Sequence, residues 1–171
     1  MRDVVELLSA DVLADAEELA DVLVDAVADG ASVGFLAPLP RPHAVSWWRA
    51  RAAAVANGVL AVWVARVDGR VEGTVQVGFS STQNGAHRAE VAKLMVLRRS
   101  RGAGLGRDLL AAAEKGAADR GASLLTLDTE TGSPAEALYR AAGWTEVGVI
   151  PDYSSAPTGG LRPTTLFYKK V

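Results

Sequence analysis

The chain has 171 residues and a formal net charge of -2 at pH 7, which suits one domain, residues 1–171, with its own hydrophobic core. The slightly acidic balance argues against a general nucleic-acid or membrane binder. The absence of cysteine excludes disulfides, thiolate metal sites and a cysteine nucleophile. The first residues lack the pattern of a secretory signal, and no apolar run reaches the roughly 18 residues of a membrane helix. We therefore expect a cytoplasmic protein.

The first part of the chain predicts a strand and then a helix. Residues 3–8 alternate weakly, which suits an edge strand, with Ser9 as the cap of the helix. From residue 11 to 28 apolar side chains recur at helical spacing, and Gly30 ends the helix. A solvated surface explains the acidic outer side of this helix, and attraction of cationic amines is the alternative. That side carries Asp11, Asp15, Glu18, Asp21, Asp25 and Asp29.

A loop rich in glycine and proline follows, over residues 30–42, and leads into a second helix that runs to about residue 56. Trp47 and Trp48 are neighbours in this helix. We expect one of them to pack in the core. The other lines a substrate mouth together with Phe35, since loops on a rigid scaffold commonly carry binding groups.

The rest of the chain alternates strands and helices without a linker. Asp68-Gly69 separates two β-rich runs and predicts a hairpin. The strands are expected at residues 59–67, 71–79, 91–97, 124–129, 145–150 and 164–169, and the helices at residues 105–118 and 134–143. This order predicts a mixed α/β fold.

A basic, glycine-rich loop, residues 98–104, joins the strand at 91–97 to the following helix. Glycine lets the backbone turn tightly and lets a ligand approach its N–H groups. The first turn of a helix has unpaired N–H groups and a partial positive charge, so it binds phosphate. Arginines at positions 98, 99, 101 and 107 add charge beside it. The loop therefore predicts a pyrophosphate cradle, and a turn that merely starts the helix is the alternative.

The spacing of the loop decides which phosphate motif it is. No lysine follows the last glycine, as a Walker loop requires, and a dinucleotide fingerprint would follow the first strand. The pattern R-x-x-G-x-G does fit, and it comprises Arg101, Gly102, Ala103, Gly104, Leu105 and Gly106. This run resembles the coenzyme A signature of the GNAT superfamily of N-acetyltransferases, and the later run AEALYRAAGW resembles another of its motifs. The segments GASVGF, NGAHRAEVAKLMVL, LLTLDTETGSPAEALY and RPTTLFYK resemble the tabtoxin resistance proteins within that superfamily more closely.

The resemblance implies an acyl-CoA N-acyltransferase fold, in which helices flank a mostly antiparallel sheet whose central strands splay apart. It implies transfer of the acetyl group of acetyl-CoA to a primary amine of a small molecule, such as a β-lactam or peptide-like toxin or antibiotic. A resistance role and a homodimer are expected by likeness only. Two alternatives remain open: a protein lysine or N-terminal acetyltransferase, and a non-catalytic acyl-CoA sensor. Nucleic acid is not expected, because the arginine loop lacks interleaved aromatic residues.

The resemblance also assigns cofactor-binding residues. The run from Arg101 to Gly106, with Arg107, holds the pyrophosphate. If the strand splays from its neighbour, the backbone at Leu94, Met95 and Val96 pairs with the pantetheine arm and polarises the thioester oxygen. Gly132 stands where many members have an asparagine that contacts this arm, and Ser133 is the replacement candidate.

The chemistry requires a base and an acid. An alkyl amine has a pKa of about 10.4 on the lysine scale, so a carboxylate must remove its proton near pH 7. Glu90 and Asp128 lie at strand ends, and the resemblance gives both positions this role; without it, each is an ordinary strand-end carboxylate. Tyr139 is the candidate acid for the departing sulfur, and half-buried packing is its alternative function. His43 and His87 show no metal-ligand spacing, so no metal is expected.

Overall fold

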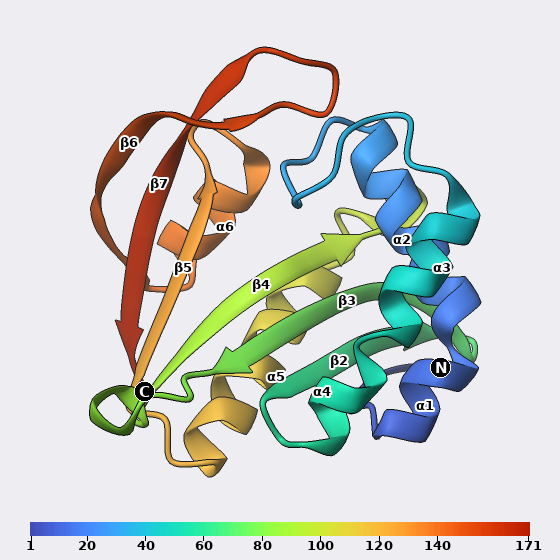
Figure 1. Cartoon of the computed structure of the whole chain (residues 1–171), viewed down its shortest axis with the longest axis horizontal. Coiled ribbons are helices and arrows are strands. Elements are labelled where there is room, and N and C mark those ends of the chain that lie inside the picture. Colours follow the sequence, from blue (N-terminus) through green and yellow to red (C-terminus); the bar gives the residue numbers. More distant parts are fainter.

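The computed structural model describes residues 1–171 and contains one seven-stranded sheet with helices on both faces (Figure 1). The strand order is β1-β2-β3-β4-β5-β7-β6. Only β4 and β5 run parallel, and every other neighbouring pair is antiparallel. The predicted fold class, a mixed α/β fold with a mostly antiparallel sheet, is confirmed. No helix is both long enough and apolar enough to cross a membrane.

The elements follow the predicted order. The strands are β1 (Arg2–Glu6), β2 (Leu60–Val67), β3 (Arg70–Phe79), β4 (Arg88–Val96), β5 (Leu124–Glu130), β6 (Thr145–Ser155) and β7 (Leu161–Lys170). The α-helices are α1 (Ser9–Ala14), α2 (Ala16–Ala28), α3 (Arg41–Arg49), α4 (Ala52–Ala56), α5 (Leu105–Asp119) and α6 (Pro134–Ala141). The hairpin at Asp68-Gly69 is confirmed, and both of its residues have positive φ angles, 50° and 83°.

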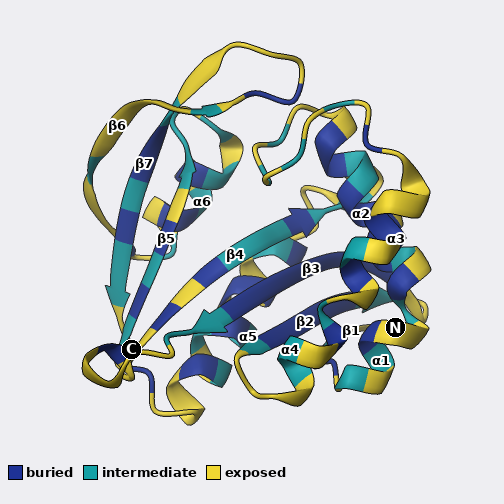
Figure 2. Cartoon of the chain, in the orientation of Figure 1, coloured by how far each residue is buried: buried dark blue, intermediate teal, exposed yellow.

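The sheet separates two apolar cores. One core lies between the sheet and α1 to α4 and contains Leu19 and Trp48, while the other lies under α5 and α6 and contains Leu109 and Phe167. Figure 2 shows β2 and β3 buried along most of their length and β6 exposed at the sheet edge. The central strands are therefore fixed from both faces.

Both predicted N-terminal helices are broken in the structure. The first is interrupted at Asp15, which separates α1 from α2, and the Asp15 carboxylate forms an ion pair with Arg66 on β2. The second is interrupted at Ala50 and Arg51, where the Arg51 N–H donates to the Trp48 carbonyl three residues back. The prediction of Ser9 as a cap is wrong, because Ser9 is the first helical residue and its hydroxyl donates to the Ala52 carbonyl at 2.9 Å.

The acidic side of α2 is a surface on which several carboxylates are both exposed and ion-paired, which agrees with the solvated surface expected from the sequence. Most of its carboxylates pair with arginines from other elements. Glu18 instead accepts a hydrogen bond from the Val71 N–H at 2.7 Å. The ion pairs are Asp15–Arg66, Asp21–Arg41, Asp25–Arg98 and Asp29–Arg101. Helix α2 is thus attached to β2, α3 and the basic loop, and few of its charges are left for a substrate.

Close packing of α5 against β2 depends on Gly116. A Cβ at this position would lie 2.2 Å from Cζ2 of Trp63, a side chain that is only 5% exposed. We predict that Gly116→Ala lowers the free energy of unfolding, because overpacking costs about 1–3 kcal/mol and helix propensity returns only about 1 kcal/mol. Urea unfolding measures this. Ala118→Ser, exposed on the same helix, is the control, and an unchanged midpoint for Gly116→Ala would show that Trp63 can move freely.

Candidate functional site

The central strands β4 and β5 pair over only three residues and then separate (Figure 1). The ladder joins Arg88 to Leu124 and ends where Glu90 meets Thr126. Beyond that point β4 has no strand partner on its β5 side, which confirms the predicted splay. Leu94, Met95 and Val96 all lie in this stretch, so the backbone groups that point away from β3 face the gap, except the Val96 carbonyl, which accepts from Arg101.

The glycine-rich loop lies at the end of β4 and leads directly into α5. Gly102 and Gly104 have φ angles of 79° and 84°, which are the left-handed conformations that favour glycine. None of the five amides from Gly102 to Gly106 donates a hydrogen bond within the chain. A Cβ on Gly106 would lie 3.9 Å from Leu138 and 4.0 Å from Val96, so the loop adjoins both α6 and β4. These free amides fit a diphosphate.

The arginines of this loop are less available than the sequence suggested. Ion pairs occupy three of them: Arg98 with Asp25 at 2.8 Å, Arg99 with Glu72 at 2.6 Å, and Arg101 with Asp29 at 2.5 Å. Arg101 also donates from Nε to the Val96 carbonyl at 3.1 Å, which fixes the loop to β4. Arg107 has no carboxylate partner. The free polar groups of the cradle are therefore its backbone amides and the Arg107 guanidinium.

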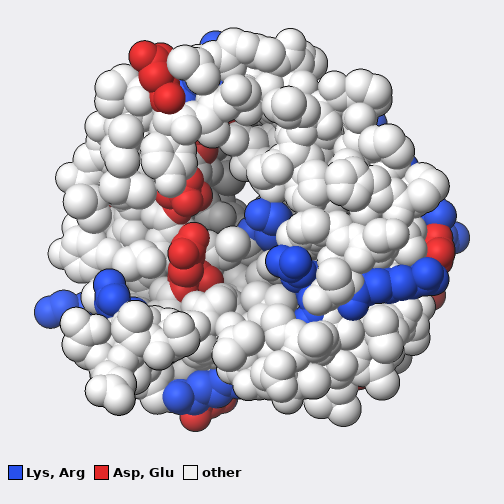
Figure 3. All heavy atoms as spheres, in the orientation of Figure 1, with Lys and Arg blue, Asp and Glu red and all other residues white.

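Glu90 and Asp128 point to the same side of the gap. Glu90 is paired with Thr126 in the parallel ladder, and side chains two residues apart on a strand share a face, so Asp128 shares the face of Glu90. A groove of about 560 Å³ is lined by Glu90, Gln76, Phe79 and Thr126 among others. Figure 3 shows a hollow on this face of the molecule, with acidic side chains along one side and basic side chains on the other.

Asp128 is held by a neighbouring strand. The Thr164 hydroxyl on β7 lies 3.0 Å from Oδ2 of Asp128 and 2.9 Å from the Thr129 carbonyl. Thr164 is 2% exposed, so its position is fixed by packing. Glu90 has no hydrogen-bond partner within the chain. The two carboxylates therefore differ in restraint: Asp128 is oriented and Glu90 is free to turn.

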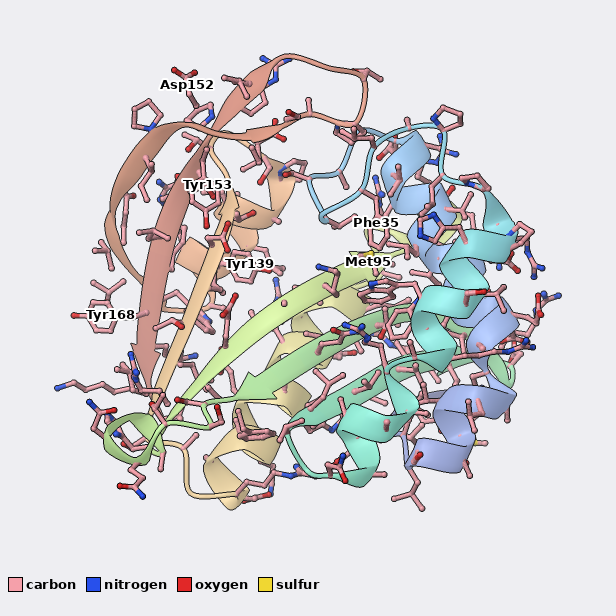
Figure 4. All side chains as sticks on the ribbon, viewed as in Figure 1. Phe35, Met95, Tyr139, Asp152, Tyr153 and Tyr168 are labelled. Atoms are coloured by element: carbon pink, nitrogen blue, oxygen red, sulfur yellow. The ribbon has the colours of Figure 1, made fainter.

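Tyr139 lies on α6, across the gap from Phe35 and Met95 (Figure 4). Its ring packs against Trp144 and Phe167, with centroids 5.9 Å and 6.2 Å away, and the residue is 5% exposed. Its hydroxyl makes no hydrogen bond within the chain. Burial, aided by the charge of Asp128, raises the pKa of Tyr139 well above its usual range. The phenol therefore keeps its proton at neutral pH.

The start of α6 is built by the residues around Gly132. Ser133 is the N-cap, and its hydroxyl accepts from the Glu136 N–H at 3.3 Å and lies 3.3 Å from that of Thr129. Oε2 of Glu136 accepts from the Gly132 N–H at 2.7 Å. Ser133 thus has a structural partner, and any contact to a pantetheine arm would be added to that capping role.

Glu136 is a buried carboxylate that links α6 to β7. Hydrogen bonds from the Thr165 hydroxyl, the Gly132 N–H and Arg140 lower its pKa below the usual range. A lowered folded-state pKa gives stability that is present above the unfolded pKa, about 4.3, and is lost as pH falls through the folded value.

We predict that Glu136→Gln destabilises the protein at pH 7 and that the difference from wild type shrinks as the pH falls below about 4. Urea unfolding from pH 7 to pH 3 measures it. Glu146→Gln is the matched control, because Glu146 pairs with the same Arg140 at 2.6 Å but is 41% exposed. A pH-independent difference between wild type and Glu136→Gln would contradict the assignment.

The tryptophan pair divides as expected between core and gap. Trp48 is 0% exposed and packs in the core with α2 and the sheet, so it is the core member of the pair and drops out as a candidate for contacting substrate. Trp47 is half-buried and stacks edge-to-face on Phe35 at 5.4 Å. Phe35 lies on a loop whose neighbours Ser32 and Ala37 contact the β6–β7 end, at 3.3 Å to Ser154 and 2.9 Å to Pro157.

Three partly or fully buried polar residues near the carboxylates or the Trp47 ring were missed in the sequence. Lys93 lies at a bulge in β4, and Arg51 and Gln76 each have a buried nitrogen without a partner. For Lys93 and Gln76 the available signal was a single charged or amide residue within an apolar run, as in VAKLMVL and GTVQVGF. Strand periodicity does not say which face such a residue takes when a bulge shifts the register.

The acetyltransferase (GNAT) domain family matches residues 59–146, more than half of the chain, so the protein belongs to this family. Among solved structures, a ribosomal-protein-alanine N-acetyltransferase from Brucella melitensis is 25% identical, with 99% of each chain covered and a TM-score of 0.79. The protein yncA from Salmonella typhimurium, solved with its cofactor acetyl-CoA, is 20% identical, with 99% and 93% covered and a TM-score of 0.78. A GCN5-related N-acetyltransferase from Kribbella flavida is 22% identical, with 99% and 98% covered and a TM-score of 0.78.

The molecule is thus an acetyl-CoA-dependent N-acetyltransferase. This outcome favours the enzyme over the acyl-CoA sensor considered from the sequence.

Proposed function

We propose that the enzyme acetylates a primary amine of a small molecule, with Glu90 or Asp128 as the base and Tyr139 as the acid. The observation that carries the proposal is the convergence of these three side chains on one gap, next to five free amides. Acetyl-CoA supplies an activated acetyl group. The chain's residues do the rest: they hold the diphosphate, take a proton from the amine and donate one to the departing sulfur.

The cofactor-binding roles follow the same gap. We assign the diphosphate to the amides from Gly102 to Gly106 and to Arg107, and we assign the pantetheine arm to the β4 backbone at Leu94–Val96. Arg101 acts by holding the loop to β4 through the Val96 carbonyl. The free β4 amides, aimed at the carbonyl oxygen of the acyl group, would stabilise the charge that develops there.

Two contacts across the edge of the hollow favour a small acceptor over a large one. The contacts from Ser32 to Ser154 and from Ala37 to Pro157 join the loop before α3 to the β6–β7 end across the hollow. A small amine reaches the carboxylates without opening these contacts. The resemblance to tabtoxin resistance proteins adds a β-lactam or peptide-like toxin to the candidates and a resistance role to the proposal.

A second candidate is acetylation of a protein N-terminus, which is favoured by the likeness to the Brucella enzyme whose name refers to the alanine of a ribosomal protein. Release of free CoA separates the two. We expect turnover with small amines from a panel of β-lactam dipeptides, aminoglycosides and amino acids. Turnover with alanine-starting protein tails alone would replace the small-molecule proposal by the second candidate.

A further inference from the structure

Two cations, Lys93 and Arg51, lie at the Trp47 ring without an ion-pair partner. Nζ of Lys93 makes no hydrogen bond or ion pair; it lies 5.8 Å from the centroid of the Trp47 ring and 3.6 Å from where a Cβ of Gly34 would be. Cζ of Arg51 lies 4.7 Å from the same ring, and its buried Nε has no partner. Both cations thus lie close to the same aromatic ring.

Lys93 and Arg51 differ from the other partly buried cations of the chain in having no ion pair. The other two partly buried cations, Arg66 and Lys169, both have carboxylate partners. Partly buried cations that lack an anion are costly, because they lose hydration without a compensating charge. Lys93 and Arg51 also repel each other. An anion from outside the chain would relieve both costs.

The backbone at Lys93 is shaped to place this side chain. The β3–β4 register shifts between Thr74 and Gln76, and Lys93 has a φ of 54°, which is uncommon for a residue other than glycine. Such conformations persist where the surrounding structure imposes them and are often found at functional sites. In a regular strand, Lys93 and Ala92 would point to opposite faces of the sheet. The bulge breaks this alternation at Lys93.

The opposing side of the hollow carries the carboxylates. Burial lowers the pKa of Lys93, the charges of Asp128 and Glu90 oppose this shift, and Arg51 adds to it. All three groups therefore lie within electrostatic reach of the ammonium. The hollow has an acidic side and a basic side, as Figure 3 shows.

We infer that the acceptor is a zwitterion: a primary amine that also carries a carboxylate, as in an amino acid or short peptide. Lys93 and Arg51 bind the carboxylate, and the amine then faces Glu90 and Asp128. Gln76, which lines the groove with an unpartnered Nε2, is placed to donate a hydrogen bond to the bound molecule. The inference rests on the proposed function and narrows it to one substrate class.

Matched acceptor pairs test the inference on the wild-type enzyme. Amino acids and dipeptides are compared with their own C-terminal amides, which keep the amine and lose the carboxylate charge. We expect kcat/KM to be at least about tenfold higher for the acids, because a site built for a charged group discriminates strongly against its loss. Equal values for acids and amides, with both being turned over, would overturn the inference and leave the proposed function intact.

Variants then test which residues bind the carboxylate of the acceptor. Lys93→Met keeps an unbranched apolar chain and removes the charge, so it should lower the acid-to-amide ratio toward one while leaving acetyl-CoA affinity unchanged. Lys115→Met, at an exposed site on α5, is the matched control and should keep the wild-type ratio. If Lys93→Met does not fold, Arg51→Met is measured in the same way.

An unchanged ratio in a folded Lys93 or Arg51 variant would refute their role in binding the carboxylate. If acetyl-CoA binds but no amine of any kind releases CoA, the proposed function fails and the acceptor inference fails with it. Preferential turnover of internal-lysine peptides, which lack a carboxylate next to the amine, would also overturn the inference.

Discussion

Tyr139→Phe is expected to lower kcat by roughly 10- to 1,000-fold, within the range typical of lost acid–base catalysis, with little change in acetyl-CoA affinity. The phenyl ring keeps the packing on Trp144 and Phe167, so only the hydroxyl is lost. The raised pKa of Tyr139 means that the wild-type hydroxyl stays protonated throughout the neutral range. Steady-state kinetics with a saturating amine, together with calorimetry of acetyl-CoA binding, measures both quantities.

Tyr168→Phe is the matched control, since Tyr168 is a half-buried tyrosine on β7 that points away from the hollow (Figure 4). We expect its kcat to stay near the wild-type value. If Tyr139→Phe retains full turnover, the tyrosine is a packing residue and the sulfur must obtain its proton elsewhere.

The second large effect concerns the base. Glu90→Gln or Asp128→Asn removes a carboxylate without changing its size, and the variant that loses the base should lower kcat/KM by about 100- to 10,000-fold at pH 7. The other variant should lose less. Because a single base serves one proton, the double variant should be close to the more damaged single variant.

The pH dependence of these variants identifies the base. At high pH the free amine needs no base, so the deficit of the true base variant should shrink as pH rises toward the amine pKa. Asp119→Asn, exposed on α5, serves as the control. Two single variants with wild-type rates at pH 7 would remove both carboxylates from the mechanism and leave only a water-mediated or substrate-assisted path.

The sequence predicted the fold well because its local signals agree with the tertiary structure. Asp68-Gly69 and the glycine-rich loop each specify a backbone conformation that few other residues adopt, and both turns occur where expected. The helix breaks at Asp15 and Arg51 were missed because apolar periodicity continues through them. Neither the ion pair of Asp15 with Arg66 nor the tight turn at Arg51 is encoded in that periodicity.

The candidate site could be predicted only in part, for the same physical reason. Glu90, Asp128 and Tyr139 were chosen as candidate catalytic residues because their motifs resemble a known family. The number of arginines free to bind phosphate was overestimated, because Arg98, Arg99 and Arg101 pair with carboxylates far away in sequence. Lys93 and Arg51 were missed because a bulge and a shared Trp47 ring, rather than any spacing, bring them together.

Calorimetry of acetyl-CoA binding to Gly104→Ala and Gly121→Ala tests the central claim, that free backbone amides after Arg101 hold the diphosphate. The two glycines lie at opposite ends of α5 with φ angles of 84° and 88°, so an added Cβ costs each a similar strain of about 1–2 kcal/mol. Only Gly104 belongs to the cradle. The account predicts measurable binding by wild type, affinity reduced at least about tenfold in Gly104→Ala, and near wild-type affinity in Gly121→Ala. Absence of wild-type binding at millimolar acetyl-CoA, or equal affinity in wild type and both variants, would contradict it.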